Sequence, residues 1–123
     1  MSGDQKISIQ SEIDLVTARM KVRDTARRMG MTLADQSRIS LATSSLANAL
    51  GLGKNGHANG SVTIECLQSD NRKGLRIRCT RYDSDYAPPL SYFSNERWMV
   101  DELEMFTPSD EQVEVCMTKW VAS

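Results

Sequence analysis

The residues that could perform chemistry are few and scattered along the chain. His57 is the only histidine and lies in a glycine-rich stretch, Gly51 to Gly60, with nothing nearby to orient it as a base. The three cysteines, Cys66, Cys79 and Cys116, form no Cys-x-x-Cys pair. Structural zinc needs four suitable ligands. We therefore expect no metal site and three reduced thiols buried within strands.

The stretch Gly51-Leu-Gly53-Lys-Asn-Gly56 matches the G-x-G-x-x-G pattern of dinucleotide-binding sites. In such sites the pattern follows a strand and opens a helix, so that the phosphate meets the N-terminus of that helix. Here it follows a predicted helix and precedes a predicted strand. We interpret it as a connecting loop rather than a nucleotide site.

Basic residues form a second cluster. Arg19, Arg23 and Arg27 recur every four residues, so they lie on one face of a predicted helix. Two interpretations remain open for this face. It is either a solvated surface or a docking surface for an acidic protein partner.

Hydrophobic periodicity predicts the elements that hold these residues. Apolar stripes at helical spacing predict helices over 12–29 and 32–50, with Ser11 and Thr32 as start signals and Gly30 and Gly51 as stops. A short helix is expected over 95–102. Alternating apolar residues predict strands over 6–10, 62–66, 75–79, 103–106 and 112–121, with turns at 69–73 and 107–110.

This order of elements predicts an α+β fold, a two-layer sandwich with helices on one face of a sheet. The other sheet face would meet solvent or a partner. The 123 residues, 40% of them hydrophobic, fit a single domain over 1–123. The net charge of −1 argues against binding nucleic acid or a membrane by bulk charge. Residues 1–6 lack the apolar core of a signal peptide, so we expect a cytoplasmic protein.

Several segments together resemble the anti-sigma-factor serine/threonine kinases, in particular the switch kinase of the bacterial stressosome. These kinases are part of the gyrase, heat-shock chaperone, histidine kinase and MutL ATPase superfamily. The resemblance implies a histidine-kinase-like ATPase fold with a mixed sheet and helices on one face. It rests on Ile7-Ser-Ile-Gln-Ser-Glu, Ala18-Arg19, Val22-Arg23, Asp35-Gln-Ser-Arg38-Ile39, Ala42-Thr-Ser-Ser-Leu46-Ala47, Asp101-Glu-Leu-Glu-Met-Phe106 and Val113-Glu-Val-Cys-Met-Thr-Lys-Trp120.

The second helix departs from the pattern of that family. Family members carry a Glu that activates the attacking group and, four residues later, an Asn that holds magnesium. The matching positions here are Ser45 and Ala49. Ser45 cannot act as a carboxylate base, and Ala49 offers no oxygen to a hard cation. Asn48 is one residue away, which places it about 100° around the helix.

Two further parts of the family's ATP site are altered. The Asp-x-Gly-x-Gly motif matches Asp83-Ser-Asp85-Tyr-Ala87, where the adenine-binding Asp survives and both glycines are replaced. The segment 90–101 contains no glycine, so the glycine-rich ATP lid is interpreted as deleted. If ATP still bound, Asp83 and Asn48 would contact it.

These departures favour a degenerate kinase-like protein, a pseudokinase without a cofactor, that regulates bacterial partner switching or stress signalling by binding proteins. The resemblance implies an anti-sigma-antagonist-fold regulator, a sigma factor or a phosphatase as partner. One alternative is an active serine/threonine kinase that uses Mg-ATP, with Asp83 on the adenine. Another is a structural scaffold that forms a homodimer through the open sheet face.

The residues around the deleted lid are aromatic. Tyr82, Tyr86, Tyr92, Phe93 and Trp98 could form one partner-binding surface, since aromatic residues are favoured at interface centres. Alternatively, Trp98 and Phe93 fill the vacated nucleotide space, because an empty apolar cavity costs stability. In that case we expect Trp98 to pack against the second helix near Ser45 and Ala49.

Overall fold

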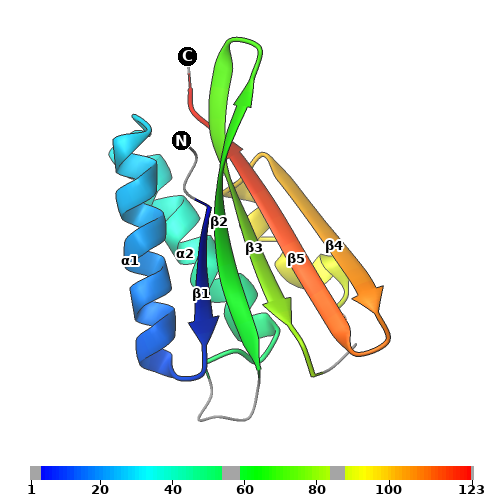
Figure 1. Cartoon of the computed structure of the whole chain (residues 1–123). Coiled ribbons are helices and arrows are strands. Elements are labelled where there is room, and N and C mark those ends of the chain that lie inside the picture. Colours follow the sequence, from blue (N-terminus) through cyan, green and yellow to red (C-terminus); the bar gives the residue numbers. More distant parts are fainter. Residues whose placement is uncertain (1–3, 54–58, 84–87, 123) are drawn as a thin grey trace.

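The computed structural model describes residues 4–53, 59–83 and 88–122. Within these residues the chain forms two helices, five strands and two short 3₁₀ turns (Figure 1). In chain order they are β1 (Gln5–Ile9), α1 (Glu12–Arg28), α2 (Leu33–Ala49), β2 (Gly60–Ser69), β3 (Arg72–Arg81), η1 (Leu90–Phe93), η2 (Glu96–Trp98), β4 (Glu102–Ser109) and β5 (Gln112–Trp120).

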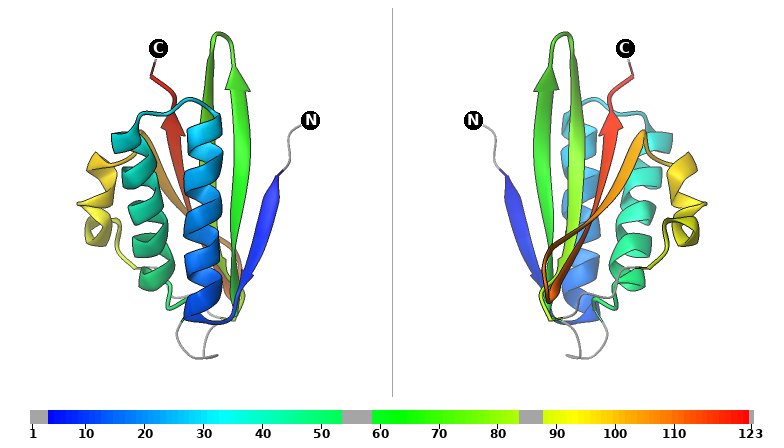
Figure 2. Two further views of the ribbon diagram at one scale, coloured as in Figure 1. Left: turned by 90° about the vertical axis from the view of Figure 1, so that its left-hand side faces the viewer. Right: turned by 90° about the vertical axis from the view of Figure 1, so that its right-hand side faces the viewer.

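The two-layer α+β sandwich expected from the sequence is present. Figure 2 shows α1 and α2 side by side on one face of the sheet, whose strand order is β1-β2-β3-β5-β4. All pairings are antiparallel, so the expectation of a mixed sheet is wrong. The reason is that α1 and α2 run in opposite directions, which returns the chain to the end of the sheet where β1 finishes.

Local signals set the helix ends. Gly30 and Gly51 adopt φ values of 93° and 80°, a left-handed conformation that favours glycine after a helix. The Thr32 hydroxyl accepts a hydrogen bond from the Asp35 N–H at 3.1 Å and so caps α2. Ser11 is the N-cap residue of α1 but makes no side-chain cap bond. Neither helix is long and apolar enough to cross a membrane, within the residues described above.

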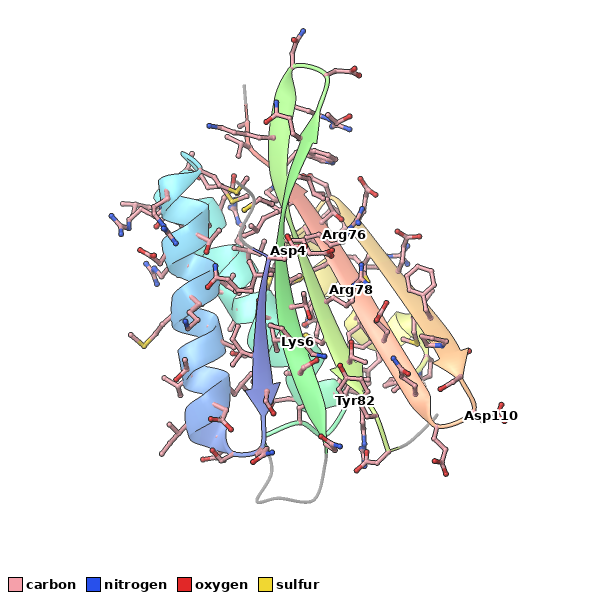
Figure 3. The ribbon with its side chains drawn as sticks, in the orientation of Figure 1. Asp4, Lys6, Arg76, Arg78, Tyr82 and Asp110 are labelled. Carbon is pink, nitrogen blue, oxygen red and sulfur yellow. The ribbon has the colours of Figure 1, made fainter. Side chains whose placement is uncertain are left out.

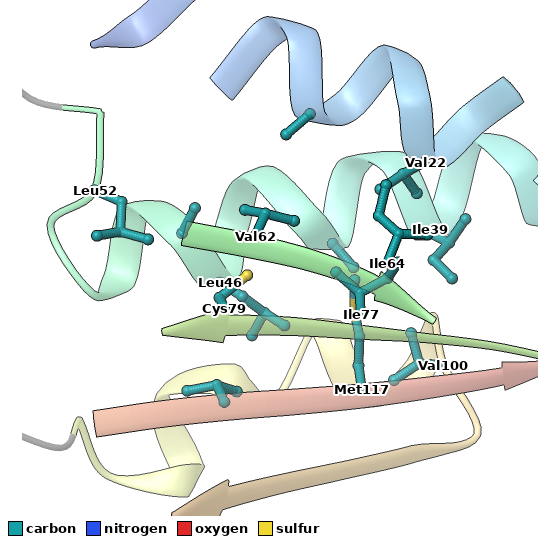
Figure 4. Packing of buried hydrophobic residues seen from close by; sticks show 14 of the residues in the cluster. Val22, Ile39, Leu46, Leu52, Val62, Ile64, Ile77, Cys79, Val100 and Met117 are labelled. Carbon is teal, nitrogen blue, oxygen red and sulfur yellow. The ribbon is translucent and has the colours of Figure 1, made fainter. Parts of the chain in front are cut away.

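The core lies between the helices and the inner face of the sheet (Figure 4). Alternate residues of the three central strands point inward, as the sequence pattern predicts. They meet the predicted apolar stripes of α1 and α2. The fully buried members include Ala18, Val22, Ile39, Ala42, Leu46, Val62, Leu75, Ile77, Cys79, Val113, Val115 and Met117.

The two hairpins are tighter than predicted. Ser69 pairs with Arg72, so the first turn consists of two residues, with Asp70 at a φ of 50°. β4 continues to Ser109 across an irregularity that begins after Phe106, so 107–108 belong to the strand rather than to a turn.

Two further expectations are wrong. Residues 95–102 form no helix, since only the single turn of η2 is present and β4 begins at Glu102. Cys66 is exposed rather than buried, whereas Cys79 and Cys116 are buried as expected. Cys66 lies in β2 beyond Ile64, the last residue of that strand paired with β1, on the hairpin whose far end extends past the helices (Figure 1).

Candidate functional site

The segment 90–101, which the sequence comparison matched to the ATP lid, contains η1 and η2. This segment lies beside α2, on the side away from α1 (Figure 2). Phe93 points into the hydrophobic core and is completely buried, and Val100 joins the same cluster. The segment therefore contributes an aromatic side chain to the core, although it contains only two turns of irregular helix.

The end of this segment is tied to the sheet and to α2 by charged groups. The Asp101 carboxylate accepts the Trp120 N–H at 2.7 Å and lies 3.6 Å from Lys119 Nζ. The same ammonium lies 3.7 Å from the buried carboxylate of Asp35, which also pairs with Arg38 at 3.1 Å. The half-buried Lys119 ammonium thus lies between the carboxylates of Asp35 and Asp101. These ion pairs hold the end of the segment at the position where β4 begins.

Asp83, the residue matched to the family's adenine-binding Asp, already has partners within this chain. One carboxylate oxygen accepts from Arg81 Nε at 2.7 Å and the other from the Asn59 N–H at 3.2 Å. The hydrogen bond from Arg81 lowers the pKa of the Asp83 carboxyl, and the Asn59 amide adds to this effect. Asp83 is thus held ionised by its own neighbours.

The Arg81 guanidinium also binds the end of α2. Its Nη1 donates to the Leu50 carbonyl at 2.9 Å, which satisfies one of the free carbonyls at the end of the helix. A side chain at Gly51 would have its Cβ 2.9 Å from this nitrogen, so the glycine leaves room for Arg81. One arginine therefore links α2, β3 and Asp83.

The remaining residues matched to the ATP site lie on α2. Ser45 and Ala49 are half-buried, and Ala49 packs against the core, whereas Asn48 is exposed. Asp85 and Ala87, the two replaced glycines, lie outside the described residues, as do Gly56 and His57. No group of three or more histidine, cysteine or acidic residues within 4–53, 59–83 and 88–122 is placed to hold a metal ion.

The expectation that Trp98 packs against α2 is wrong. Its side chain is 90% exposed, and Phe93 fills the core instead. Tyr92 and Leu90 are also exposed, at 65% and 42%. The large apolar residues exposed in this segment, Leu90, Tyr92 and Trp98, are called the η surface below. Large exposed aromatic residues such as Trp98 are of the type enriched at binding interfaces.

The five aromatic residues singled out in the sequence do not form one surface. Tyr82 points to the open face of the sheet, where its hydroxyl is 2.9 Å from Ser61 Oγ and its ring lies beneath Lys6 (Figure 3). Phe93 is buried, and Tyr86 lies outside the described residues. Of these five residues, Tyr92 and Trp98 are the two that are exposed in the segment with η1 and η2. The Tyr92 ring packs edge-on against Phe93.

The basic face of α1 is exposed as the sequence predicts. Arg19, Arg23 and Arg27 all reach solvent. Arg27 pairs with Asp24, whose pKa is lowered by this hydrogen bond and by the charge of Arg28. Arg19 and Arg23 have no ion-pair partner within the described part of the chain. These two guanidinium groups are thus the ones available to an acidic partner.

A stripe of apolar side chains beside these arginines was missed in the sequence. Ile13, Val16 and Met20 are 77%, 46% and 66% exposed on α1. Their spacing of three and four residues, opposite the buried stripe, could have indicated a second apolar face. We call these three residues, with Arg19, Arg23 and Arg27, the α1 surface.

Comparison with known proteins agrees with the resemblance found in the sequence. The chain is 35% identical over 79 residues to the serine/threonine-protein kinase RsbT of Bacillus subtilis (strain 168). The match includes 63% of this chain and 56% of that relative, so the chain spans about half the length of the curated protein. No family model matches the chain. The chain is therefore a distant homologue of a serine/threonine-protein kinase.

Proposed function

Because the chain is distantly homologous to a serine/threonine-protein kinase, we propose that it is a degenerate member of that lineage that regulates bacterial partner switching or stress signalling by binding proteins. In this proposal it no longer transfers phosphate. Its partner is an anti-sigma-antagonist-fold regulator, a sigma factor or a phosphatase, the classes that the resemblance implies.

The observation that supports this proposal best is the pairing of Asp83. One carboxylate oxygen accepts from Arg81 and the other from Asn59, so fewer of its acceptor sites remain for an adenine amino group. Ser45 and Ala49 add no base and no metal ligand on α2. Phe93 lies in the core, in a segment, 90–101, that contains no glycine.

The two exposed surfaces support the binding part of the proposal. The α1 surface combines apolar side chains with the unpaired guanidinium groups of Arg19 and Arg23, which suits a partner with acidic residues around an apolar centre. The η surface presents Trp98, and tryptophan is enriched among residues that dominate binding energy.

Titration calorimetry with Mg-ATP tests the loss of nucleotide binding. We expect no affinity tighter than about 1 mM, or about −4 kcal/mol. The RsbT kinase, measured in the same buffer, is the positive control. A micromolar constant for this chain would contradict the pseudokinase proposal.

Binding to a candidate regulator from the native host tests the second part. We expect Trp98→Ala and Arg23→Glu to weaken the complex while the melting temperature stays unchanged. Lys73→Glu is the matched control, since Lys73 is an exposed cation on the β2–β3 hairpin rather than on α1. Equal binding of all three variants and the unmodified chain would leave both surfaces without a function.

An active divergent kinase is the second candidate, since the homologous protein is named a kinase and Asp83 is retained. That candidate requires a base that replaces the missing Glu. Transfer of labelled phosphate from ATP to an antagonist-type substrate by the unmodified chain would establish it. The pseudokinase proposal expects no transfer above the level of a blank without protein.

A further inference from the structure

The exposed apolar side chains of α1 follow a coiled-coil spacing. Ile13, Val16 and Met20 are separated by three and four residues, and all three are exposed. Arg23 and Arg27 occupy the next two positions of this seam, so its apolar part ends at Met20. Exposed apolar residues at this spacing form the side of a helix that packs on a second helix.

Charged residues border the seam unevenly on its two sides. Glu12 shares one side with Arg19 and Arg23, which follow it by seven and eleven residues. Asp14 shares the other side with Lys21. The helix macrodipole favours acidic residues in the first turn and basic residues in the last turn, but Arg19 and Arg23 lie in the interior turns of α1. The dipole therefore does not explain these two arginines.

The charges on the first side are not neutralised within the chain. Glu12, Arg19 and Arg23 make no ion pair within residues 4–53, 59–83 and 88–122. Asp24, the nearest other carboxylate of α1, already pairs with Arg27 and with Arg28. One acidic group and two basic groups beside the seam are thus available to another molecule.

A second copy of α1 that runs in the opposite direction covers the apolar part of the seam. If the midpoint of the pair lies between Val16 and Thr17, Ile13 lies level with the partner's Met20, and Met20 lies level with the partner's Ile13. The apolar segments then coincide along their whole length. A pair centred nearer the end of α1 would place the apolar residues against arginines instead.

The same alignment also matches the charges. A two-fold axis perpendicular to the helices brings the same side of each seam together. Glu12 then lies between the partner's Arg19 and the partner's Arg23, because its level is that of residue 21. On the other side Asp14 lies near the partner's Lys21. Each of these contacts occurs twice, since the interface is symmetric.

A parallel pair would have the opposite electrostatic result. Its two-fold axis runs along the helices and brings opposite sides of the seam together at the same level. Glu12 would then lie beside the partner's Asp14, and Arg19 and Arg23 would lie beside the partner's Lys21. Like charges in contact are unfavourable, so the charge pattern selects the antiparallel pair.

We propose that two copies of the chain associate through α1, with the helices antiparallel and the apolar seams in contact. This inference names a second copy as the partner of the α1 surface, so it rests on the part of the proposed function that makes this surface a docking site. It does not depend on the loss of phosphate transfer. The segment with the η surface lies on the side of α2 away from α1, so it stays free for a regulator (Figure 2).

Sedimentation equilibrium of the full chain over a range of concentrations tests this proposal. Three apolar residues per copy make a small contact beside the about 1,200–2,000 Å² of stable complexes, so we expect a dissociation constant in the micromolar range. Salt should weaken the dimer. A mass that stays that of the monomer up to about 1 mM would overturn the proposal.

A pair of charge-reversed variants tests the predicted contacts. Glu12→Lys and the double variant Arg19→Glu/Arg23→Glu should each dimerise at least about tenfold more weakly alone, because like charges then meet twice. A mixture of the two should dimerise again, because every reversed charge meets an opposite one. Lys73→Glu on the β2–β3 hairpin is the control and should change nothing. A mixture that associates no better than its components would contradict the arrangement.

Two apolar positions identify the face that is used. Val16→Glu should abolish the dimer, whereas Phe106→Glu should leave it unchanged, because Phe106 lies in β4 and is not part of α1. The reverse result would overturn the proposal and place the contact at the sheet. Melting temperatures of both variants within a few degrees of the unmodified chain show that neither effect comes from unfolding.

Cross-linking tests the direction of the helices. In chains that carry Cys66→Ser, which removes the exposed native thiol, Ile13→Cys and Met20→Cys variants should form a disulfide when mixed and oxidised, and little when oxidised separately. Efficient cross-linking of each variant with itself would indicate parallel helices and overturn the proposal.

Binding to a regulator separates this inference from the proposed function. If the unmodified chain remains a monomer while Arg19→Glu/Arg23→Glu still loses a regulator, the second copy is excluded and the α1 surface keeps its proposed role. If the dimer forms as described and no regulator binds, the proposed role in signalling fails and the contact between copies stands.

Discussion

Truncation of Phe93 should cost this domain a large share of its stability. Phe93 is completely buried in the core although it lies in a segment with only short 3₁₀ turns. Its neighbour Trp98, five residues further along, is 90% exposed. The pair therefore allows the same kind of truncation to be made once inside and once outside the core.

The magnitude follows from the buried area. A buried aromatic side chain removes about 150–250 Å² from water, which at about 25 cal/mol per Å² corresponds to about 4–6 kcal/mol. This is an upper estimate because the unfolded chain already covers part of that surface. Core Phe→Ala substitutions cost about 3–5 kcal/mol, and we expect Phe93→Ala to fall in that range.

Thermal unfolding followed by circular dichroism measures this loss. For a domain of this length about 1 kcal/mol shifts Tm by roughly 3–5 °C, so Phe93→Ala should lower Tm by roughly 10–25 °C. Phe93→Leu keeps part of the side chain and should give a smaller shift, which preserves a measurable transition if the alanine variant does not fold.

Trp98→Ala is the matched control and should change the free energy of unfolding by less than about 0.5 kcal/mol, as exposed substitutions do. A Tm of Phe93→Ala within about 2 °C of the unmodified chain would refute the conclusion that this segment supplies a core residue. So would a loss in Trp98→Ala as large as that in Phe93→Ala.

Four further outcomes are expected. Arg23→Glu should slow association with an acidic partner and reduce its dependence on salt, as measured by stopped-flow mixing, while a charge reversal on the distant hairpin does neither. Ser45→Glu alone should give no phosphate transfer in a labelled-ATP assay, because residues that act as a unit do not restore activity singly. A thiol reagent at pH 8 should modify exposed Cys66 quickly and the other two cysteines slowly, since burial raises the pKa of Cys79 and of Cys116 to about 12. Because these two thiols hold their protons more tightly in the folded chain than in the unfolded one, denaturant titrations should show stability falling as pH rises from about 9 to 12.

The elements that the sequence predicted well are those determined by local patterns. Both helices lie within one or two residues of their expected ends, because apolar residues recur at helical spacing and glycines at positions 30 and 51 adopt a left-handed conformation. The central strands were equally clear, since their alternation has one buried face.

Features set by distant contacts were not predictable in the same way. The pattern of β2 suggested a buried Cys66, and nothing local reveals that the hairpin outgrows the helices. The mixed sheet was implied by resemblance alone. Strand direction depends on how the connecting helices turn back, and the periodicity of a single strand does not contain that information.

The choice between Phe93 and Trp98 illustrates the same limit within one segment. Both are large aromatic residues in the segment 90–101, and the segment has no period that would distinguish an inward from an outward position. From the sequence we expected Trp98 to pack against the second helix, because the side chain of Trp98 is large and those of Ser45 and Ala49 are small. In the structure, the backbone carbonyl of Pro89 accepts from Tyr92 and that of Asn95 accepts from Trp98, and these two turns direct Phe93 inward and leave Trp98 outside.

Asp83 shows why a surviving motif residue is weak evidence for a surviving activity. The Asp83 carboxylate accepts from Arg81, the last residue of β3, which lies two residues earlier in the chain. The same guanidinium closes the end of α2 through the Leu50 carbonyl, so replacing Asp83 would disturb a structural contact whether or not ATP binds. Loss of stability in an Asp83→Ala variant therefore carries no information about nucleotide. Direct titration with Mg-ATP does, because it measures the contact that the motif would serve.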